Sequence, residues 1–160
     1  MSVLSRLDVD MTNLHASGTS QMMKAAIEGL TREDGTRPIL IAVTQLTSTD
    51  SDALKNQLLI DESMEKVVIH YAENAKLSGL DGVVCSPLEA EAVHNACGRN
   101  FVTVTPGVRF ADGEKGDQKR VMTPLQAKLI GSDYIVVGRP ITSADDPVAA
   151  YQRCVDEFVG

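Results

Sequence analysis

Several features that mark common protein classes are missing from this sequence. Its three cysteines, Cys85, Cys97 and Cys154, form no CxxC pair, which argues against a disulfide framework and predicts reduced thiols in a cytoplasmic protein. The three histidines show no spacing typical of metal ligands, so we expect no metal site. The longest apolar runs are strand-sized and predict no membrane span, and the first residues lack the apolar stretch of a secretory signal.

Positive charge is also scarce. Lysine and arginine number 15 against 22 aspartates and glutamates, which gives a formal net charge of -7 and argues against nucleic acid or an anionic membrane as a partner. The chain length suits a single domain, residues 1–160. An apolar fraction of 43% is typical of a folded protein, and a chain of this length can bury a sizeable core.

Short apolar runs alternate with longer amphipathic segments along the chain. Most of the runs are rich in β-branched residues and nearly continuous, as in parallel strands covered by helices; they lie at residues 39–43, 82–85, 101–104 and 134–137, with a weaker, alternating run at 9–15. Helices are predicted by apolar spacing after Ser20 and from Met64, and by start signals at Ser86-Pro87, Thr123-Pro124 and Asp146-Pro147. In the last helix Val148, Tyr151, Val155 and Phe158 share one face. The β-α order repeats about five times and predicts a parallel sheet.

Two parallel architectures compete for this order of elements. A doubly wound sheet has a glycine-rich fingerprint after its first strand, but none follows His15 and no GxGxxG occurs anywhere. A (β/α)8 TIM barrel has polar residues at the carboxyl ends of its strands, as found here at residues 15, 44–47, 86, 105 and 139. A barrel typically has about 250 residues and eight units. The sequence therefore predicts an α/β fold, a partial TIM barrel of about five β/α units.

The predicted strand at residues 134–137 ends in Gly138-Arg139. A buried strand with this ending would place a guanidinium at the barrel mouth, next to a backbone N–H that glycine lets a ligand approach. Phosphate-binding barrels hold their phosphate after strands seven and eight. One interpretation is that Arg139 binds a phosphate, and the other is a surface ion pair with Asp145 or Asp146.

A long, charged loop with several glycines follows the predicted strand at residues 101–104. Arg109 and Gln118 in this loop could bind the same anion as Arg139, if the loop closes over a ligand. The alternative is a solvated loop with no role in binding.

Two further polar side chains follow predicted strands. Thr47 could bind a ligand, or Thr47 and Ser48 could simply cap the next helix. His15 is expected to be a packed, hydrogen-bonded histidine rather than an acid or base.

Six segments in this order resemble the orotidine 5′-phosphate decarboxylase family; they are residues 9–16, 42–48, 79–86, 105–109, 116–118 and 137–142. The resemblance covers essentially the whole chain and implies a carboxy-lyase of pyrimidine biosynthesis, which converts orotidine 5′-phosphate to uridine 5′-monophosphate and CO₂ without a metal or organic cofactor. It implies a homodimer, and it identifies the chain with strands 4–8, the C-terminal part of the barrel. Arg109, Gln118, Gly138 and Arg139 would then hold the 5′-phosphate, and Thr47 would face the pyrimidine.

One motif of the family is not in the sequence. The family's Asp-x-Lys-x-x-Asp signature lies upstream of the segment at 9–16, and its lysine stabilises the carbanion at C6 and then protonates it. Asp117-Gln118-Lys119 shares part of that spacing but belongs to the charged loop. We therefore expect no catalytic residue here, and a truncated enzyme that is inactive by itself. The alternatives are a non-catalytic nucleotide- or phosphate-binding remnant and a related sugar-phosphate decarboxylase.

Overall fold

The strands form one parallel sheet in the order of the chain. The computed structural model describes residues 1–112 and 122–160, and within them five strands pair in the order β1-β2-β3-β4-β5. The strands are β1 (Met11–His15), β2 (Ile39–Val43), β3 (Gly82–Val84), β4 (Val102–Thr105) and β5 (Tyr134–Ile135). The helices are η1 (Leu4–Arg6), η2 (Ala16–Gly18), α1 (Thr19–Leu30), α2 (Ser51–Asn56), α3 (Met64–Leu77), η3 (Pro87–Glu89), α4 (Ala90–Cys97), α5 (Pro124–Ile130), α6 (Arg139–Thr142) and α7 (Pro147–Phe158). The α/β fold and the parallel sheet predicted from the sequence are confirmed.

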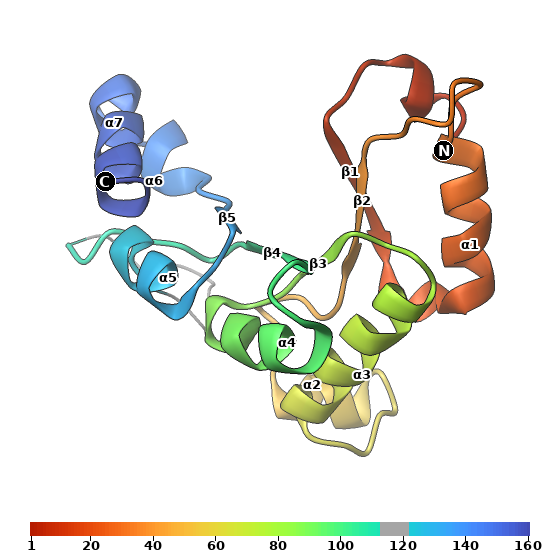
Figure 1. Ribbon diagram of the computed structural model, residues 1–160. Helices are drawn as coiled ribbons and strands as arrows, with labels where there is room; N and C mark the ends of the chain where they lie inside the picture. Colours follow the sequence, from red (N-terminus) through yellow and green to blue (C-terminus); the bar gives the residue numbers. More distant parts are fainter. Residues whose placement is uncertain (113–121) are drawn as a thin grey trace.

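Helices α1, α3, α4 and α5 lie along the outer side of the sheet, while β1 and β5 stand at its two ends (Figure 1). The core lies between the strands and these helices. Leu40 of β2 and Val83 of β3 are fully buried there against Leu30 of α1 and Val68 of α3. On β1, Leu14 is buried in this core, whereas Asn13 and His15 are exposed. This two-residue period of burial matches the alternating pattern of the run at residues 9–15, and it leaves Asn13 and His15 on the open face of the strand.

Two of the three predicted start signals, Ser86 and Thr123, are present as capping boxes. Ser86 N–H donates to Glu89 Oε2 at 2.8 Å, and Thr123 N–H donates to Gln126 Oε1 at 3.0 Å. Gly131 ends α5 with a φ of 92°, a left-handed conformation that glycine adopts without strain. The turn after Ser86 is the 3₁₀ helix η3, so the α-helical part of that segment begins only at α4.

The last strand is more exposed than the sequence predicts, and the apolar face of the last helix is open as well. The run at residues 134–137 was expected to be a buried strand, but β5 has only two residues, and Tyr134 and Val136 are 48% and 49% exposed. On α7 the apolar face is also open, with Val148 at 78% and Tyr151 at 58% exposure. The prediction of a buried strand at residues 134–137 was wrong, because β5 has a neighbour on one side only within the described part of the chain.

Asp81 joins β2 to the start of β3 at the amino edge of the sheet. Its Oδ2 accepts the backbone N–H of Leu40 at 2.7 Å. Both oxygens also accept hydrogen bonds from the guanidinium of Arg37, and the bond to Asp81 raises the pKa of Arg37. The carboxylate therefore holds two neighbouring strands in register by a bond that a hydrophobic side chain could not make.

Asp133 joins β4 to the start of β5 in the same way, through a hydrogen bond from a backbone N–H to its carboxylate. Its Oδ2 accepts the backbone N–H of Thr103 at 2.7 Å and the hydroxyl of Thr103 at 3.0 Å. It also accepts Nε2–H of the buried His94 at 3.1 Å, while Arg99 donates to Nδ1 of that ring at 3.4 Å. The ring of His94 therefore lies between Asp133 on one side and Arg99 on the other.

All three cysteines are buried, and none of them forms a disulfide. Burial raises the pKa of the Cys97 and Cys154 thiols, because the charged thiolate loses its hydration there. Burial of the protonated thiols therefore stabilises the fold. This stabilisation is fully present below the unfolded thiol pKa of about 8.5 and is lost as the pH rises through the higher pKa of the folded state.

We expect Ellman's reagent to label the native chain at pH 8 at least about 100-fold more slowly than the chain in guanidinium chloride, because all three thiols are buried in the native chain and burial raises the pKa of two of them, Cys97 and Cys154. All three thiols should react once the chain is unfolded. One thiol that reacts at the unfolded rate in native protein would contradict the packing described here.

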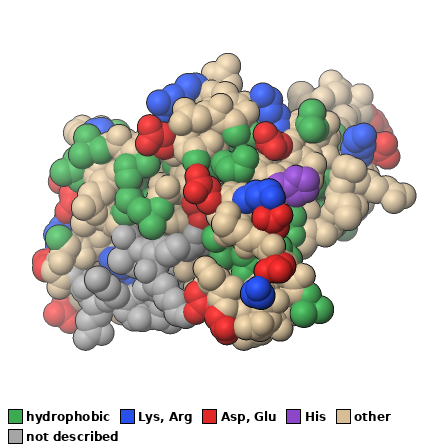
Figure 2. All heavy atoms as spheres, turned by 90° about the horizontal axis from the view of Figure 1, so that it is seen from below, with side chains coloured by type: hydrophobic (Ala, Val, Ile, Leu, Met, Phe, Trp, Pro, Cys, Tyr) green, Lys and Arg blue, Asp and Glu red, His purple; other side chains and the backbone are tan. Residues whose placement is uncertain are grey.

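The helical side of the molecule has a mixed surface. Seen from below, acidic and basic side chains are interspersed, with small groups of apolar side chains between them (Figure 2). None of the helices among the described residues is both long and apolar enough to cross a membrane. Within the same residues, no three His, Cys, Asp or Glu side chains gather in a way that could hold a metal ion.

Candidate functional site

The residues proposed from the sequence lie at the carboxyl edge of the sheet. Thr47 follows β2, Arg109 follows β4, and Gly138-Arg139 follow β5. Because the strands are parallel, their carboxyl ends point to the same edge, where α/β proteins of this kind bind ligands. Gln118 and the rest of residues 113–120 of the long charged loop lie outside the described residues. Four of the five predicted binding residues therefore share one edge.

Arg109 is held in the wall of this edge rather than extended into solvent. Val108 is fully buried and forms a parallel bridge with Met122. The backbone N–H of Arg109 donates to Met122 O at 2.9 Å, and its Nη1 donates to Val108 O at 2.7 Å. The residue is only 9% exposed, and the hydrogen bond to Val108 O holds its guanidinium against the neighbouring backbone.

Gly138 and Arg139 lie where β5 turns into α6. Gly138 has a negative φ, so the backbone does not require glycine here, but the space that a Cβ would enter is open to 4 Å. Arg139 is the first residue of α6 and is exposed. Asp146, one alternative partner considered for Arg139, uses Oδ1 to accept the N–H groups of Val148 and Ala149 at the start of α7.

Thr47 is buried in the loop after β2. The helix that follows, α2, is capped by Asp50, whose Oδ1 accepts the N–H of Ala53 at 2.9 Å. Thr47 and Ser48 are therefore not the cap, and that alternative is wrong. Thr44 Oγ1 donates to Val84 O at 2.9 Å and ties the start of this loop to β3.

His15 differs from its prediction. It ends β1, beside Val43 in the parallel register, and its side chain is exposed rather than packed. Asn13, two residues earlier, is exposed on the same face. The alternating pattern of this strand already indicated that His15 would be exposed. Side chains on the polar face of a strand stay exposed to solvent unless another element covers them.

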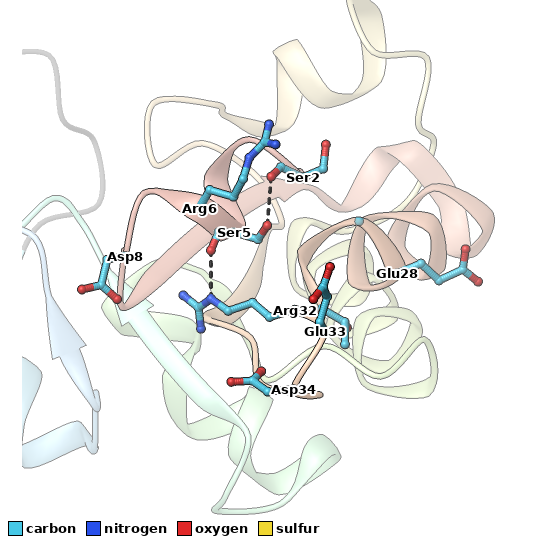
Figure 3. Close-up of a pocket in the computed structure, with 10 residues that line it drawn as sticks. Ser2, Ser5, Arg6, Asp8, Glu28, Arg32, Glu33 and Asp34 are labelled. Atoms are coloured by element: carbon cyan, nitrogen blue, oxygen red, sulfur yellow. Dashed lines mark hydrogen bonds between the residues drawn. The ribbon is translucent and has the colours of Figure 1, made fainter.

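A separate hollow of about 780 Å³ lies at the opposite, amino edge of the sheet, near Arg6 and Arg32. Arg32 Nε donates to Ser5 O at 2.8 Å (Figure 3). The acidic side chains that line it are Asp8, Glu28, Glu33 and Asp34. Four carboxylates against two guanidiniums make it unsuited to a phosphate.

Comparison with known proteins gives the family. A sequence profile of the orotidine 5′-phosphate decarboxylase / HUMPS family matches residues 1–154. The chain belongs to this family. It is 54% identical over 163 aligned residues to an orotidine 5′-phosphate decarboxylase of Geobacillus sp. (strain WCH70), and the match covers 100% of this chain and 68% of the relative. The resemblance read from the six segments is confirmed.

Solved structures give the same result for the fold. The orotidine 5′-phosphate decarboxylase from Lactobacillus acidophilus superposes with a TM-score of 0.85 at 44% identity, covering 99% of this chain and 67% of that one. An uncharacterized conserved protein from Geobacillus kaustophilus superposes with a TM-score of 0.81, also at 44% identity, covering 98% and 67%. The chain is thus a member of a family of carboxy-lyases, with the parallel β/α arrangement of the decarboxylase barrels. The relatives carry the orotidine name, so a sugar-phosphate decarboxylase is not favoured.

Proposed function

We propose that this chain supplies the phosphate and pyrimidine contacts of an orotidine 5′-phosphate decarboxylase. Arg109, Gln118, Gly138 and Arg139 bind the 5′-phosphate, and Thr47 faces the pyrimidine ring. The observation that supports this is the convergence of strand ends: β4 and β5 are neighbours, and Arg109 and Arg139 follow them at one edge. Two guanidiniums at one edge suit a dianionic phosphate, because arginine makes bidentate, charge-assisted hydrogen bonds to phosphate oxygens.

The two arginines have different roles in this proposal. Arg109 is buried and fixed, so it provides a preformed part of the phosphate site. Arg139 is exposed, next to the open space at Gly138, so it can approach the phosphate together with the neighbouring backbone N–H. Binding of the remote phosphate in this family would then favour closure over the reacting ring.

The wider properties of the family come with the proposal. We propose a place in pyrimidine nucleotide biosynthesis, a homodimeric assembly and a cytoplasmic location. The substrate or product is a small nucleotide, orotidine or uridine 5′-monophosphate.

Arg139→Ala should weaken the binding of uridine 5′-monophosphate by roughly 10- to 100-fold, because it removes a charge-assisted contact to the phosphate. Titration calorimetry on the purified chain measures the change in Kd. Arg6→Ala is the matched control, since it removes the same charge at the amino edge of the sheet, and its Kd should equal that of the unchanged chain. An unaltered Kd in Arg139→Ala would refute the proposed phosphate site.

A further inference from the structure

Arg153 on α7 holds a segment that lies 41 residues earlier in the chain. Its Nη1 donates to both carboxylate oxygens of Asp112, to Oδ1 at 3.0 Å and to Oδ2 at 3.1 Å. Its guanidinium also lies over the ring of Phe110, with Cζ 4.1 Å from the ring centroid. Within α7, its Nε donates to Glu157 Oε1 at 2.8 Å. We call the contacts of Arg153 with Phe110 and Asp112 the Arg153 tether.

The Arg153 tether combines several interactions that are weak one by one. An isolated ion pair between exposed side chains contributes little, and the side chains of Arg153 and Asp112 are 41% and 72% exposed. Here one guanidinium pairs with two carboxylates and stacks on an aromatic ring, and such a network holds its geometry better than a single pair. A backbone hydrogen bond and the bond from Arg153 both lower the pKa of Asp112, so this carboxylate is charged at neutral pH.

Both partners of Arg153 lie just beyond Arg109, in the segment that leaves the end of β4. Arg109 is buried, and its backbone N–H donates to Met122 O at 2.9 Å. Phe110 and Asp112 come one and three residues later, so the tether acts on the chain directly after the buried arginine. An arginine whose flanking chain is held in advance loses less conformational freedom when it binds an anion.

Helix α7 also contacts the element that carries the second arginine. It packs against α6, which begins at Arg139, and the two helices lie side by side (Figure 1). One helix therefore contacts the segment after Arg109 through the tether and the segment of Arg139 through its packing. Because the two arginines follow different strands, β4 and β5, a shared contact with α7 limits how far they can move apart.

We propose that Arg153 is a positioning residue, whose tether fixes Arg109 relative to Arg139 at the phosphate of a bound nucleotide. Arg153 does not contact the phosphate in this proposal, since it acts through residues 110–112. The nature of the ligand rests on the proposed function, whereas the tether itself is tested without any ligand.

The first measurement is hydrogen exchange of the Arg109 amide, followed by nuclear magnetic resonance in the absence of ligand. Arg153→Ala should speed this exchange by at least about 10-fold, because the bond to Met122 O opens more often once the following residues are released. Gln152→Ala is the control, since Gln152 lies next to Arg153 on α7 and donates to Asp156 of the same helix. It should leave the exchange rate unchanged. An unaltered rate in Arg153→Ala would overturn the proposal.

The second measurement is the binding of uridine 5′-monophosphate and of uridine by the same variants. Arg153→Ala should weaken the binding of the nucleotide by about 3- to 10-fold and leave that of uridine, which has no phosphate, unchanged. Equal weakening of both ligands would show a general loss of structure and overturn the positioning role. Asp112→Ala should act in the same direction, and the double variant should weaken binding by less than the product of the two single effects, because both substitutions break one tether. Fully independent effects would contradict it.

The two measurements separate the failure of this proposal from that of the proposed function. An unchanged chain that binds no nucleotide refutes the proposed function and with it the phosphate as the ligand, while faster exchange in Arg153→Ala would still support the tether. If the unchanged chain binds the nucleotide and Arg153→Ala binds it with the same Kd, the positioning role is overturned and the proposed function stands.

Discussion

Orotidine 5′-phosphate should remain unconverted in the presence of the 160-residue chain alone. The family resemblance implies that a lysine within an Asp-x-Lys-x-x-Asp signature supplies the charge and the proton at C6, and this signature is not in the sequence. Contacts to the phosphate bind substrate and transition state alike unless they position a working catalytic group. We therefore expect a rate at least about 10⁴-fold below that of the full-length Geobacillus sp. relative, from the combined loss of the acid and of the stabilising charge.

The lysines of this chain lie in other places. Of the seven, five are on helices among the described residues: Lys24 (α1), Lys55 (α2), Lys66 and Lys76 (α3) and Lys128 (α5). Lys55 pairs with Asp61, Lys66 pairs with Glu62, and Lys128 donates to Val159 O at 2.8 Å. None of these five follows the carboxyl end of a strand, where a rigid scaffold could hold an ammonium against the substrate. The other two, Lys115 and Lys119, lie outside the described residues.

The measurement is the loss of orotidine 5′-phosphate absorbance with time. The chain is purified from a host strain that lacks its own decarboxylase, and the full-length Geobacillus sp. relative serves as the positive control. Binding of uridine 5′-monophosphate by the same sample shows that the chain is folded. Turnover that remains after repeated purification would mean that a lysine of this chain is catalytic.

Asp133→Ala should lower the free energy of unfolding by about 2–3 kcal/mol, a figure that already allows for the 36% exposure of the Asp133 side chain. The substitution removes the acceptor of three hydrogen bonds, from the backbone and hydroxyl of Thr103 and from His94. The buried N–H of Thr103 would then lack the acceptor that it has here, and β5 would lose a tie to β4 beyond its two-residue pairing. In a chain of this size such a loss lowers Tm by roughly 5–10 °C.

Denaturant unfolding of Asp133→Ala and Asp145→Ala tests this. Asp145 is an exposed aspartate downstream of the same strand, so its substitution makes the same change in charge and side chain and should cost less than about 0.5 kcal/mol. Thr103→Val is a second comparison, because it leaves the Asp133 carboxylate in place and removes only the Thr103 hydroxyl, which donates to Asp133 Oδ2 and accepts the backbone N–H of Asp133. Equal midpoints for the two aspartate variants would show that Asp133 does not hold β5 to β4.

The sequence alone determined the features whose partners are close along the chain. The capping boxes at Ser86 and Thr123 close within three residues, so the sequence places these helix starts without knowledge of the rest of the fold. The alternation of strands and helices, the parallel sheet and the polar face of β1 follow from local periodicity in the same way. The placement of Thr47, Arg109, Gly138 and Arg139 at one edge also follows, since each stands just past the end of a parallel strand.

Only the tertiary structure decided how far each of these residues is buried and what it contacts. His15 and Tyr134 are exposed because no described element covers their side of the sheet. The type of a residue does not by itself predict whether another element packs against it. Asp81 contacts Arg37 across 44 residues of chain, and Asp133 contacts His94 across 39 and Thr103 across 30. These bonds form only when the sheet brings distant segments together, and the energy of a buried hydrogen bond depends on that meeting rather than on local propensity.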